Sequence, residues 1–195
     1  MKATEILRSE HDTIKKMLAV LDAACDRIER KEPVAATDLV RITEFMSAFA
    51  DHCHHAKEED LLFDLIESLG LSEIVPLVNE LSTEHTMGRA LRMSVNDEIE
   101  AIIDGAAPDT TDFVEFARSY VLLLAHHICK EDLNLFPAVD RLLTAEQQRE
   151  LSAKFDRVHR ERFTADIHTE SSQLVQELQT AYGASDRIAR LCEQR

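Results

Sequence analysis

The sequence has little glycine and proline and no tryptophan, and only 5% of its 195 residues are aromatic. Four glycines and four prolines are too few for a collagen-like or linker-dominated chain, and a hydrophobic content of 45% excludes general disorder. Long apolar runs are also missing. Runs such as residues 121–125 are far short of the ~20 residues that a membrane-spanning helix needs, and no signal-peptide core follows Met1. We therefore expect one compact cytoplasmic domain.

Basic residues are outnumbered. The chain carries 22 Lys and Arg against 37 Asp and Glu, which gives a net charge of -15, and it contains no long basic run. This charge repels nucleic-acid phosphates and anionic lipid headgroups. The sequence thus predicts neither a nucleic-acid partner nor a membrane partner.

The cysteines lack the spacing of a structural framework. Cys25, Cys53, Cys129 and Cys192 lie far apart and form no CxxC pair. This pattern argues against a disulfide scaffold and against a thiolate zinc site. We expect four reduced thiols.

Low glycine and proline with abundant Leu, Ala, Glu and Arg favour helices over strands. A threonine followed three residues later by glutamine, at Thr144 and Gln147, predicts a capping box. Short connections make successive helices antiparallel. We expect an all-α, up-down-up-down four-helix bundle over residues 1–143, and residues 144–195 as a helical extension of the same domain. The expected helices run from Thr4 to about Lys31, from Thr37 to Gly70, from Ser72 to Gly105, from Thr110 or Thr111 through a disturbance at Pro137, and from Thr144 to about Gly183, with one more short helix possible in the tail.

Histidine positions repeat along the chain. The motif SEH at residues 9–11 recurs as TEH at 83–85, and H-x3-E with a phenylalanine five residues after the glutamate occurs twice. With a helix rise of ~1.5 Å per residue, the four histidines of these motifs are expected at one height of the bundle. The repeated residues are His11, His54, Glu58 and Phe63 in the first half and His85, His127, Glu131 and Phe136 in the second.

Residues four apart share one helix face, so each H-x3-E motif directs an imidazole and a carboxylate to the same point. Four imidazoles and two bridging carboxylates suit two metal ions, with iron favoured over manganese or zinc. A single such pair on a Glu-rich helix would more simply be a solvated pair. The pairs His126/Glu131 and His55/Glu59 stay open as alternatives, although only the first register gives both halves the same spacing.

The SEH motif, CHHAKEEDLLF and HHICKEDLNLFP together resemble the hemerythrin-like HHE cation-binding family, in its bacterial four-histidine form. The resemblance covers about residues 4–140 and implies a four-helix bundle with two iron ions joined by an oxo or hydroxo bridge. Oxygen-carrying members add a histidine four residues after the third-helix ligand, where this chain has Arg89. Exchangeable positions on both metals are therefore implied. The implied ligands are His11, His54, Glu58, His85, His127 and Glu131.

Several neighbouring residues are candidates for supporting roles. Tyr120, two turns before His127, is the candidate catalytic residue because its phenol could hydrogen-bond a bound ligand. Glu10 and Glu84 precede ligand histidines and are candidates to orient them. The remaining candidates are His159 and His168, which could reach the metals, and Cys53 and Cys129, which are either small core residues or redox-responsive thiols.

These features predict a redox di-iron protein that binds O2, H2O2 or NO, with peroxide decomposition in a stress response favoured over oxygen transport. The alternative is a non-catalytic oxygen or iron sensor, carrier or iron store. Whether the protein is an enzyme, whether it forms homo-oligomers and which metal it holds are left open by the sequence.

Overall fold

The computed structural model describes residues 1–105, 109–163, 166–184 and 188, without the side chains of residues 159 and 162. Every regular element in this part of the chain is helical, which confirms the all-α prediction. Within the same residues, no helix combines the length and the apolar character needed to cross a membrane. The elements in chain order are α1 (Ala3–Glu29), α2 (Ala36–Phe45), η1 (Met46–His55), η2 (Glu58–Phe63), α3 (Asp64–Ser68), α4 (Val75–Ile103), α5 (Thr111–Lys130), η3 (Glu131–Leu135), α6 (Phe136–Leu142), α7 (Ala145–Arg162) and α8 (Ile167–Tyr182), where η marks π-helix.

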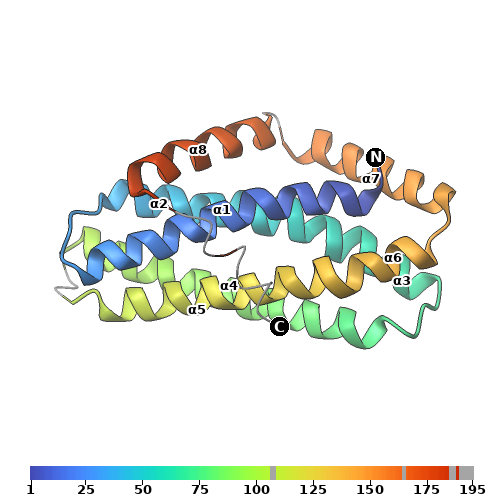
Figure 1. The fold of residues 1–195 in the computed structure, drawn as a ribbon, viewed down its shortest axis with the longest axis horizontal. Coiled ribbons are helices and arrows are strands. Elements are labelled where there is room, and N and C mark those ends of the chain that lie inside the picture. The colour runs from blue at the N-terminus through green and yellow to red at the C-terminus, as the bar shows by residue number, and fades with distance from the viewer. Residues whose placement is uncertain (106–108, 164–165, 185–187, 189–195) are drawn as a thin grey trace.

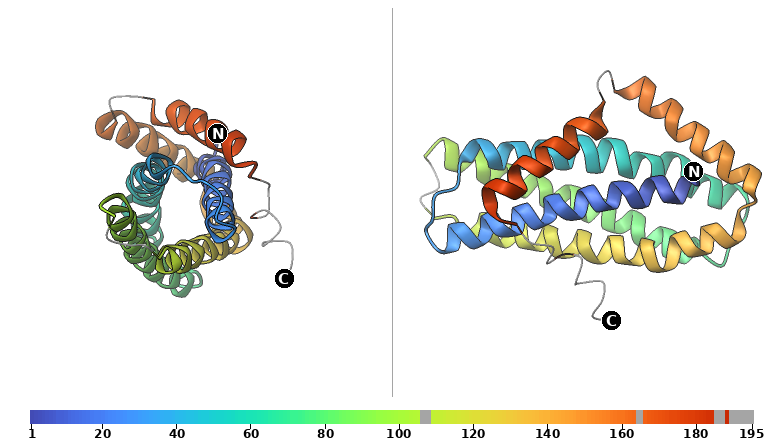
Figure 2. Two further views of the ribbon diagram at one scale, coloured as in Figure 1. Left: turned by 90° about the vertical axis from the view of Figure 1, so that its left-hand side faces the viewer. Right: turned by 45° about the horizontal axis from the view of Figure 1, so that its top comes forward.

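Four long helical segments lie side by side around a common axis, as the end-on view in Figure 2 shows. They are α1, the continuous segment 36–68, α4, and the continuous segment 111–142. Each runs opposite to the one before it (Figure 1). Helices α7 and α8 lie outside these four, against α1 and the segment 36–68.

The helix ends follow the sequence signals only in part. Lys2, not Thr4, is the N-cap of α1, and the buried Thr4 hydroxyl instead donates to Asp140 Oδ1 on α6 at 2.8 Å. The capping box at Thr144 is confirmed: Gln147 N donates to Thr144 Oγ1 at 3.2 Å, and Thr144 N donates to Gln147 Oε1 at 2.8 Å.

The prediction of one long helix after Thr144 is wrong. Helix α7 ends at Arg162 and α8 begins at Ile167. Asp166 is the N-cap of α8 and accepts a hydrogen bond from Thr169 N at 3.3 Å, so an aspartate cap inside the expected helix starts a new one. Gly183 ends α8 in the left-handed conformation, with φ 61°. The tail helix predicted after it falls almost wholly outside the described residues.

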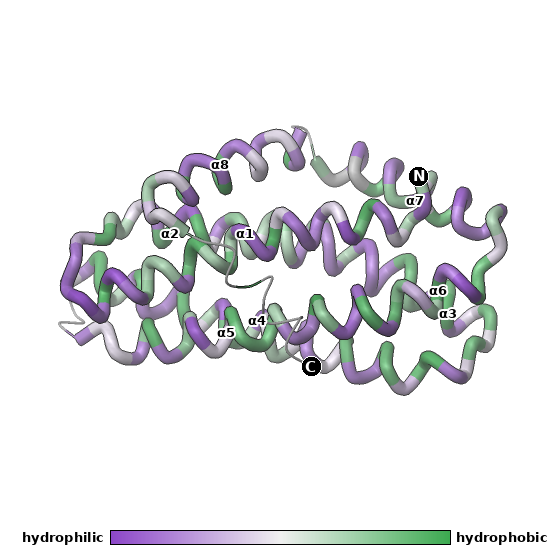
Figure 3. The backbone as a smooth tube through the Cα atoms, in the orientation of Figure 1, coloured by the Kyte–Doolittle hydropathy of each residue, from purple (hydrophilic) through white to green (hydrophobic). Residues whose placement is uncertain are grey.

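Two apolar clusters fill the interior and leave a polar layer between them. The α7-side cluster includes Leu7, Leu81 and Phe136, and the α8-side cluster includes Ile14 and Leu124. His11 lies between Leu7 and Ile14 on α1, and the other three segments pass from one cluster to the other in the same way. Figure 3 shows hydrophobic and hydrophilic residues interleaved along each helix, as expected for helices with one buried face. The polar layer is thus closed off by packed side chains above and below.

Candidate metal centre

The structure brings together all six side chains that the sequence predicts as ligands. Each comes from a different helical element of the four segments, and each is at most 1% exposed. The ligand atoms of His11, His54, Glu58 and Glu131 lie within 4.8 Å of one another. A second such group joins Glu58 to His85, His127 and one residue outside the predicted set, His55.

Each carboxylate lies between two imidazoles from different segments. Glu131 Oε2 is 3.2 Å from His127 Nε2 on its own segment and 3.1 Å from His11 Nε2 on α1. Glu58 Oε1 is 3.5 Å from His54 Nε2 on its own segment, and its Oε2 is 3.5 Å from His85 Nε2 on α4. Both glutamates are therefore in position to link two cations.

The three π-helical segments coincide with the ligand positions. His54 lies in η1, and Glu58 and Glu131 are the first residues of η2 and η3. A π-helical turn takes one more residue than an α-helical turn, so neighbouring side chains are rotated closer together on the inner face. Such turns are rare and are frequent at functional sites.

The buried atoms at the centre of the cluster lack partners that protein groups would normally supply. Among the described residues, no hydrogen-bond partner is found for His11 Nε2, His54 Nε2, or either carboxylate oxygen of Glu58 and Glu131. Nε2 of His85 and Nε2 of His127 face each other at 2.9 Å. Unpaired buried polar atoms are costly, and cations between these nitrogens and oxygens would satisfy them. The donor set fits metal cations.

The other nitrogen of each predicted ligand histidine faces a carboxylate. A carboxylate only accepts hydrogen bonds, so each Nδ1 carries a proton and Nε2 is the nitrogen left to bind a metal. Glu10 and Glu84 accept from the histidine of another segment, not from the histidine next to them in sequence. The four Nδ1–oxygen distances are 2.9 Å for His11–Asp132, 2.9 Å for His54–Glu10, 2.7 Å for His85–Glu59 and 3.1 Å for His127–Glu84.

Each of these carboxylates also meets a basic side chain. We call each series of imidazole, carboxylate and cation a relay. The carboxylate–cation pairs of the four relays are Glu10 with Lys57, Glu84 with Lys130, Glu59 with Arg89 at 2.9 Å, and Asp132 with Arg8 at 3.2 Å and Lys15 at 3.4 Å.

Carboxylates dominate the electrostatics of the metal-free site. Burial opposes a positive charge on His11, but Asp132 and Glu131 outweigh it and raise the pKa of His11 to about 10. Burial likewise opposes charge on His85, yet Glu58 and Glu59 raise its pKa to about 9. Without metal the cluster therefore holds protons where cations would sit, and metal binding must release them.

His55 is the buried histidine that the ligand prediction missed. Its Nδ1 lies 3.1 Å from Asp51 Oδ1, and Asp51 Oδ2 accepts from Arg92 Nε at 2.9 Å. Its ring stacks on His85 with 3.9 Å between centroids. Burial, together with the neighbouring imidazole of His85, lowers the pKa of His55 well below its usual value, so the ring is neutral. Spacing alone also allows the pair His55/Glu59, but Glu59 accepts from His85 instead.

The other predicted residues take mixed positions. Tyr120 is buried, and burial with the nearby Asp51 raises its pKa, so its phenol stays protonated. Among the described residues, no hydrogen bond joins its hydroxyl to the six side chains. His168 on α8 lies 3.5 Å from Glu10 Oε1 and so approaches the carboxylate behind His54. The His159 side chain lies outside the described residues.

The cysteines differ from one another. Cys53 is a buried thiol whose Sγ lies 3.2 Å from Lys57 Nζ, and Cys25 is a buried thiol in the apolar interior. Cys129 is disulfide-bonded. The prediction of four reduced thiols is therefore wrong at Cys129, where scattered spacing along the sequence hid a pairing.

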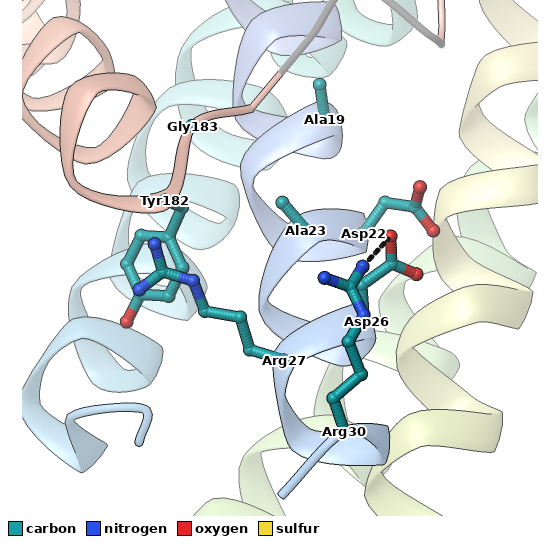
Figure 4. Close-up of a pocket in the computed structure, with 8 residues that line it drawn as sticks. All are labelled: Ala19, Asp22, Ala23, Asp26, Arg27, Arg30, Tyr182 and Gly183. Carbon is teal, nitrogen blue, oxygen red and sulfur yellow. Dashed lines mark hydrogen bonds and ion pairs between the residues drawn. The ribbon is translucent and has the colours of Figure 1, made fainter. Parts of the chain in front are cut away.

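A surface pocket of about 250 Å³ lies away from the cluster, between α1 and the end of α8 (Figure 4). Its charged walls are largely paired within the protein: Arg30 Nη2 is 3.3 Å from Asp26 Oδ2, and the Arg27 guanidinium lies 4.7 Å from the Tyr182 ring centroid. This pocket is explained by the docking of α8 on α1.

The fold and the site define a class: an all-helical protein with a buried cluster of histidines and glutamates that fits metal cations. The model of the hemerythrin HHE cation binding domain matches residues 2–139. The chain belongs to this family, whose members bind metal cations, typically iron.

Relatives of the chain are found in mycobacteria. An uncharacterized protein of Mycobacterium bovis and two uncharacterized proteins of Mycobacterium tuberculosis, from strains CDC 1551 and H37Rv, are each 25% identical to it over 163 residues. The match covers 83% of this chain and 62% of each relative, so the chain spans less than two thirds of their length. No solved structure matches the chain.

Proposed function

We propose that the protein holds two iron ions at this cluster and decomposes hydrogen peroxide, with O2 and NO as further small-molecule ligands. The scaffold in this proposal is an up-down-up-down four-helix bundle over residues 1–143, with residues 144–195 as its extension, and the protein works in the cytoplasm. The observation that carries the proposal is the set of buried nitrogen and carboxylate atoms that no described protein group satisfies.

When bound, two iron ions would supply Lewis acidity and electrons for chemistry on an O–O bond. The net reaction converts two H2O2 into two water molecules and one O2, so one peroxide is reduced while the other is oxidised. The proposed ligands are His11, His54, Glu58, His85, His127 and Glu131.

The surrounding side chains prepare the site for this role. Glu10, Glu59, Glu84 and Asp132 fix each ligand imidazole with Nε2 turned inward. The two apolar clusters exclude bulk water on both sides of the layer, which limits leakage of reactive oxygen species.

A second candidate is a non-catalytic sensor, carrier or iron store, in which metal or ligand occupancy changes the stability of the bundle. It is favoured by the depth of the site, because binding of a cation there connects four helical segments at once. Turnover separates it from the first candidate.

The first experiment measures metal content and optical spectra of protein purified from iron-supplied cells. We expect two irons per chain and an oxo-to-iron charge-transfer band in the oxidised form. We expect the same metal content and spectra in the control variant His126→Ala, because His126 neighbours His127 but lies outside both ligand groups. A single zinc ion, or no metal, would contradict the dinuclear site.

The second experiment measures reactions of the iron-loaded protein. We expect it to consume H2O2 faster than an equal amount of free iron, and its reduced form to react with O2 without a long-lived reversible adduct. Tyr120→Phe is expected to change the rate at unchanged metal content if the phenol reaches the bound ligand. An O2 adduct that is released under vacuum, with no peroxide consumption, would support the carrier or sensor instead.

A further inference from the structure

The two halves of the site repeat almost residue by residue. His54, Glu58 and Lys57 correspond to residues 73 positions later, and His11 and Glu10 to residues 74 positions later. Lys15, four residues after His11, corresponds to Arg89, four residues after His85. Both contact the carboxylate behind that histidine. Arg89 therefore plays the same part in its half as Lys15 does in the other: it holds a carboxylate and is not itself a metal ligand.

A fifth relay departs from this repeat. It consists of His55, Asp51 and Arg92, with the Nδ1–Oδ1 and Nε–Oδ2 distances of 3.1 and 2.9 Å given above. At the same offsets, the corresponding residues of the other half are Ile128, Leu124 and Leu18, all apolar and at most 2% exposed. The bundle can thus fill these positions with aliphatic side chains, so packing alone does not call for three polar ones.

All five buried histidines in the described residues share one arrangement, with Nδ1 turned to a carboxylate. For His55 this leaves Nε2 as the nitrogen with a lone pair. A ligand atom of His55 lies within 4.8 Å of those of Glu58, His85 and His127. Its ring centroid is 3.9 Å from that of His85 and 5.8 Å from that of His127. His54 and His55 both lie in the π-helix η1, and both are buried.

We propose that His55 is a fifth nitrogen ligand, and that it binds the metal held by His85 and His127. Asp51 orients the imidazole, and Arg92 holds Asp51 in place. The centre is then asymmetric, with three imidazoles on one metal and two, from His11 and His54, on the other. With His55 bound to the other metal, the His11/His54 side would keep the exchangeable position for peroxide, O2 or NO, and one open metal would replace the two that Arg89 implies from the sequence. This inference rests on the proposed dimetal site.

The first test counts ligand imidazoles in the wild-type protein. Chelator-treated protein is loaded with Co²⁺, and hyperfine-shifted exchangeable N–H protons are counted by NMR, since each ligand histidine keeps an Nδ1 proton held by a carboxylate. We expect five such signals. Four signals would overturn the inference and leave the dimetal site standing, whereas a protein that takes up no cobalt would contradict both proposals.

The second test uses His55→Gln, whose amide can still donate to Asp51, and His55→Ile, which copies the residue found at the equivalent position of the other half. We expect each variant to lose one of the five N–H signals and to bind one of its two cobalt ions at least about tenfold more weakly. His52→Ala, on the same π-helical turn but bonded through Nδ1 to Ser47 O, is the control and keeps both affinities. If either folded variant keeps both cobalt affinities and all N–H signals, His55 is not a ligand.

Discussion

The two halves of the site use the same relays at different depths. In the first half, Glu10 and Lys57 pair with only 2% of either side chain exposed. In the second half, the equivalent Glu84 and Lys130 pair with 14% and 24% exposed. The same sequence pattern therefore gives a buried ion pair in one half and a partly solvated pair in the other.

The difference comes from α7 and α8. These helices pack against α1 and the segment 36–68, and His168 of α8 reaches Glu10 Oε1 at 3.5 Å. No counterpart is described over Glu84. Two outer helices thus change the dielectric environment of a repeated motif without changing its residues, and substitutions that are matched between halves should have unequal effects.

The two glutamates proposed to bridge the metals should give the largest difference between the halves. Glu58 belongs to both four-residue groups of ligand atoms, whereas Glu131 belongs to one. We expect Glu58→Ala to abolish binding of both metals and Glu131→Ala to retain part of the metal, measured by elemental analysis per chain. Glu67→Ala, at an exposed position on the same segment as Glu58, is the control. Two metals and unchanged spectra in either variant would mean that the wrong carboxylates are assigned, and Glu59 and Asp132 would be tested next.

The buried ion pair gives the next largest effect. In chelator-treated protein, Glu10→Ala leaves the Lys57 ammonium buried and uncompensated, which costs about 3–5 kcal/mol of unfolding free energy. Glu84→Ala leaves Lys130 partly in water, and we expect a loss of only about 0–1 kcal/mol. Urea unfolding measures both. The double variant Glu10→Ala/Lys57→Met should recover most of the loss, because it removes the stranded charge. Equal losses in the two halves would show that α7 and α8 do not set the difference.

Much of the fold and of the predicted site could be read from the sequence because both are periodic. Helix boundaries near Gly70, Thr111 and Gly183 follow local signals. The six predicted ligands follow from spacing that is the same in both halves, and the structure places them together. Glu59 and Asp132, which accept from ligand histidines, could also have been predicted, because each directly follows a glutamate predicted to bridge the metals.

His55 was not within reach of the same argument. The predicted ligands were chosen because they repeat in both halves, and the position equivalent to His55 is Ile128, so the repeat gave no reason to choose His55. The break before α8 was missed for a different reason, because Asp166 is a polar residue on an otherwise continuous helical pattern and only its bond to Thr169 N marks it as a cap.

Proton binding sharpens the comparison between His11 and His85 in chelator-treated protein. Both pKa values are raised in the folded state, to about 10 and about 9, above the usual 6.5. A raised pKa adds stability that is fully present below pH 6.5 and is lost as the pH rises through the folded value. We expect the Tm of the metal-free protein to fall between pH 6.5 and 10. In His11→Gln, we expect the portion of this fall that occurs at the higher pH values to disappear. A Tm that stays level over this range would contradict the protonated cluster. Metal-loaded protein should not show the fall, since metal replaces the protons.

The smallest expected effect is at the outer ends of two equivalent relays. Arg89 and Lys15 hold Glu59 and Asp132, with side chains 36% and 22% exposed. Exposed pairs of this kind contribute about 0.2–1 kcal/mol, so Arg89→Gln and Lys15→Gln should each lower the unfolding free energy by less than about 1 kcal/mol and leave both metals bound.

The carboxylate held by Arg89 should matter more than Arg89 itself. Glu59→Ala should weaken the binding affinity for one metal by about 10- to 100-fold, because it frees the ring of His85. If Arg89→Gln instead lost a metal while Lys15→Gln did not, Arg89 would act on the metal beyond holding Glu59. The position that carries a histidine in oxygen-carrying hemerythrins would then be functionally distinct from its partner in the first half, and the relay symmetry would end there.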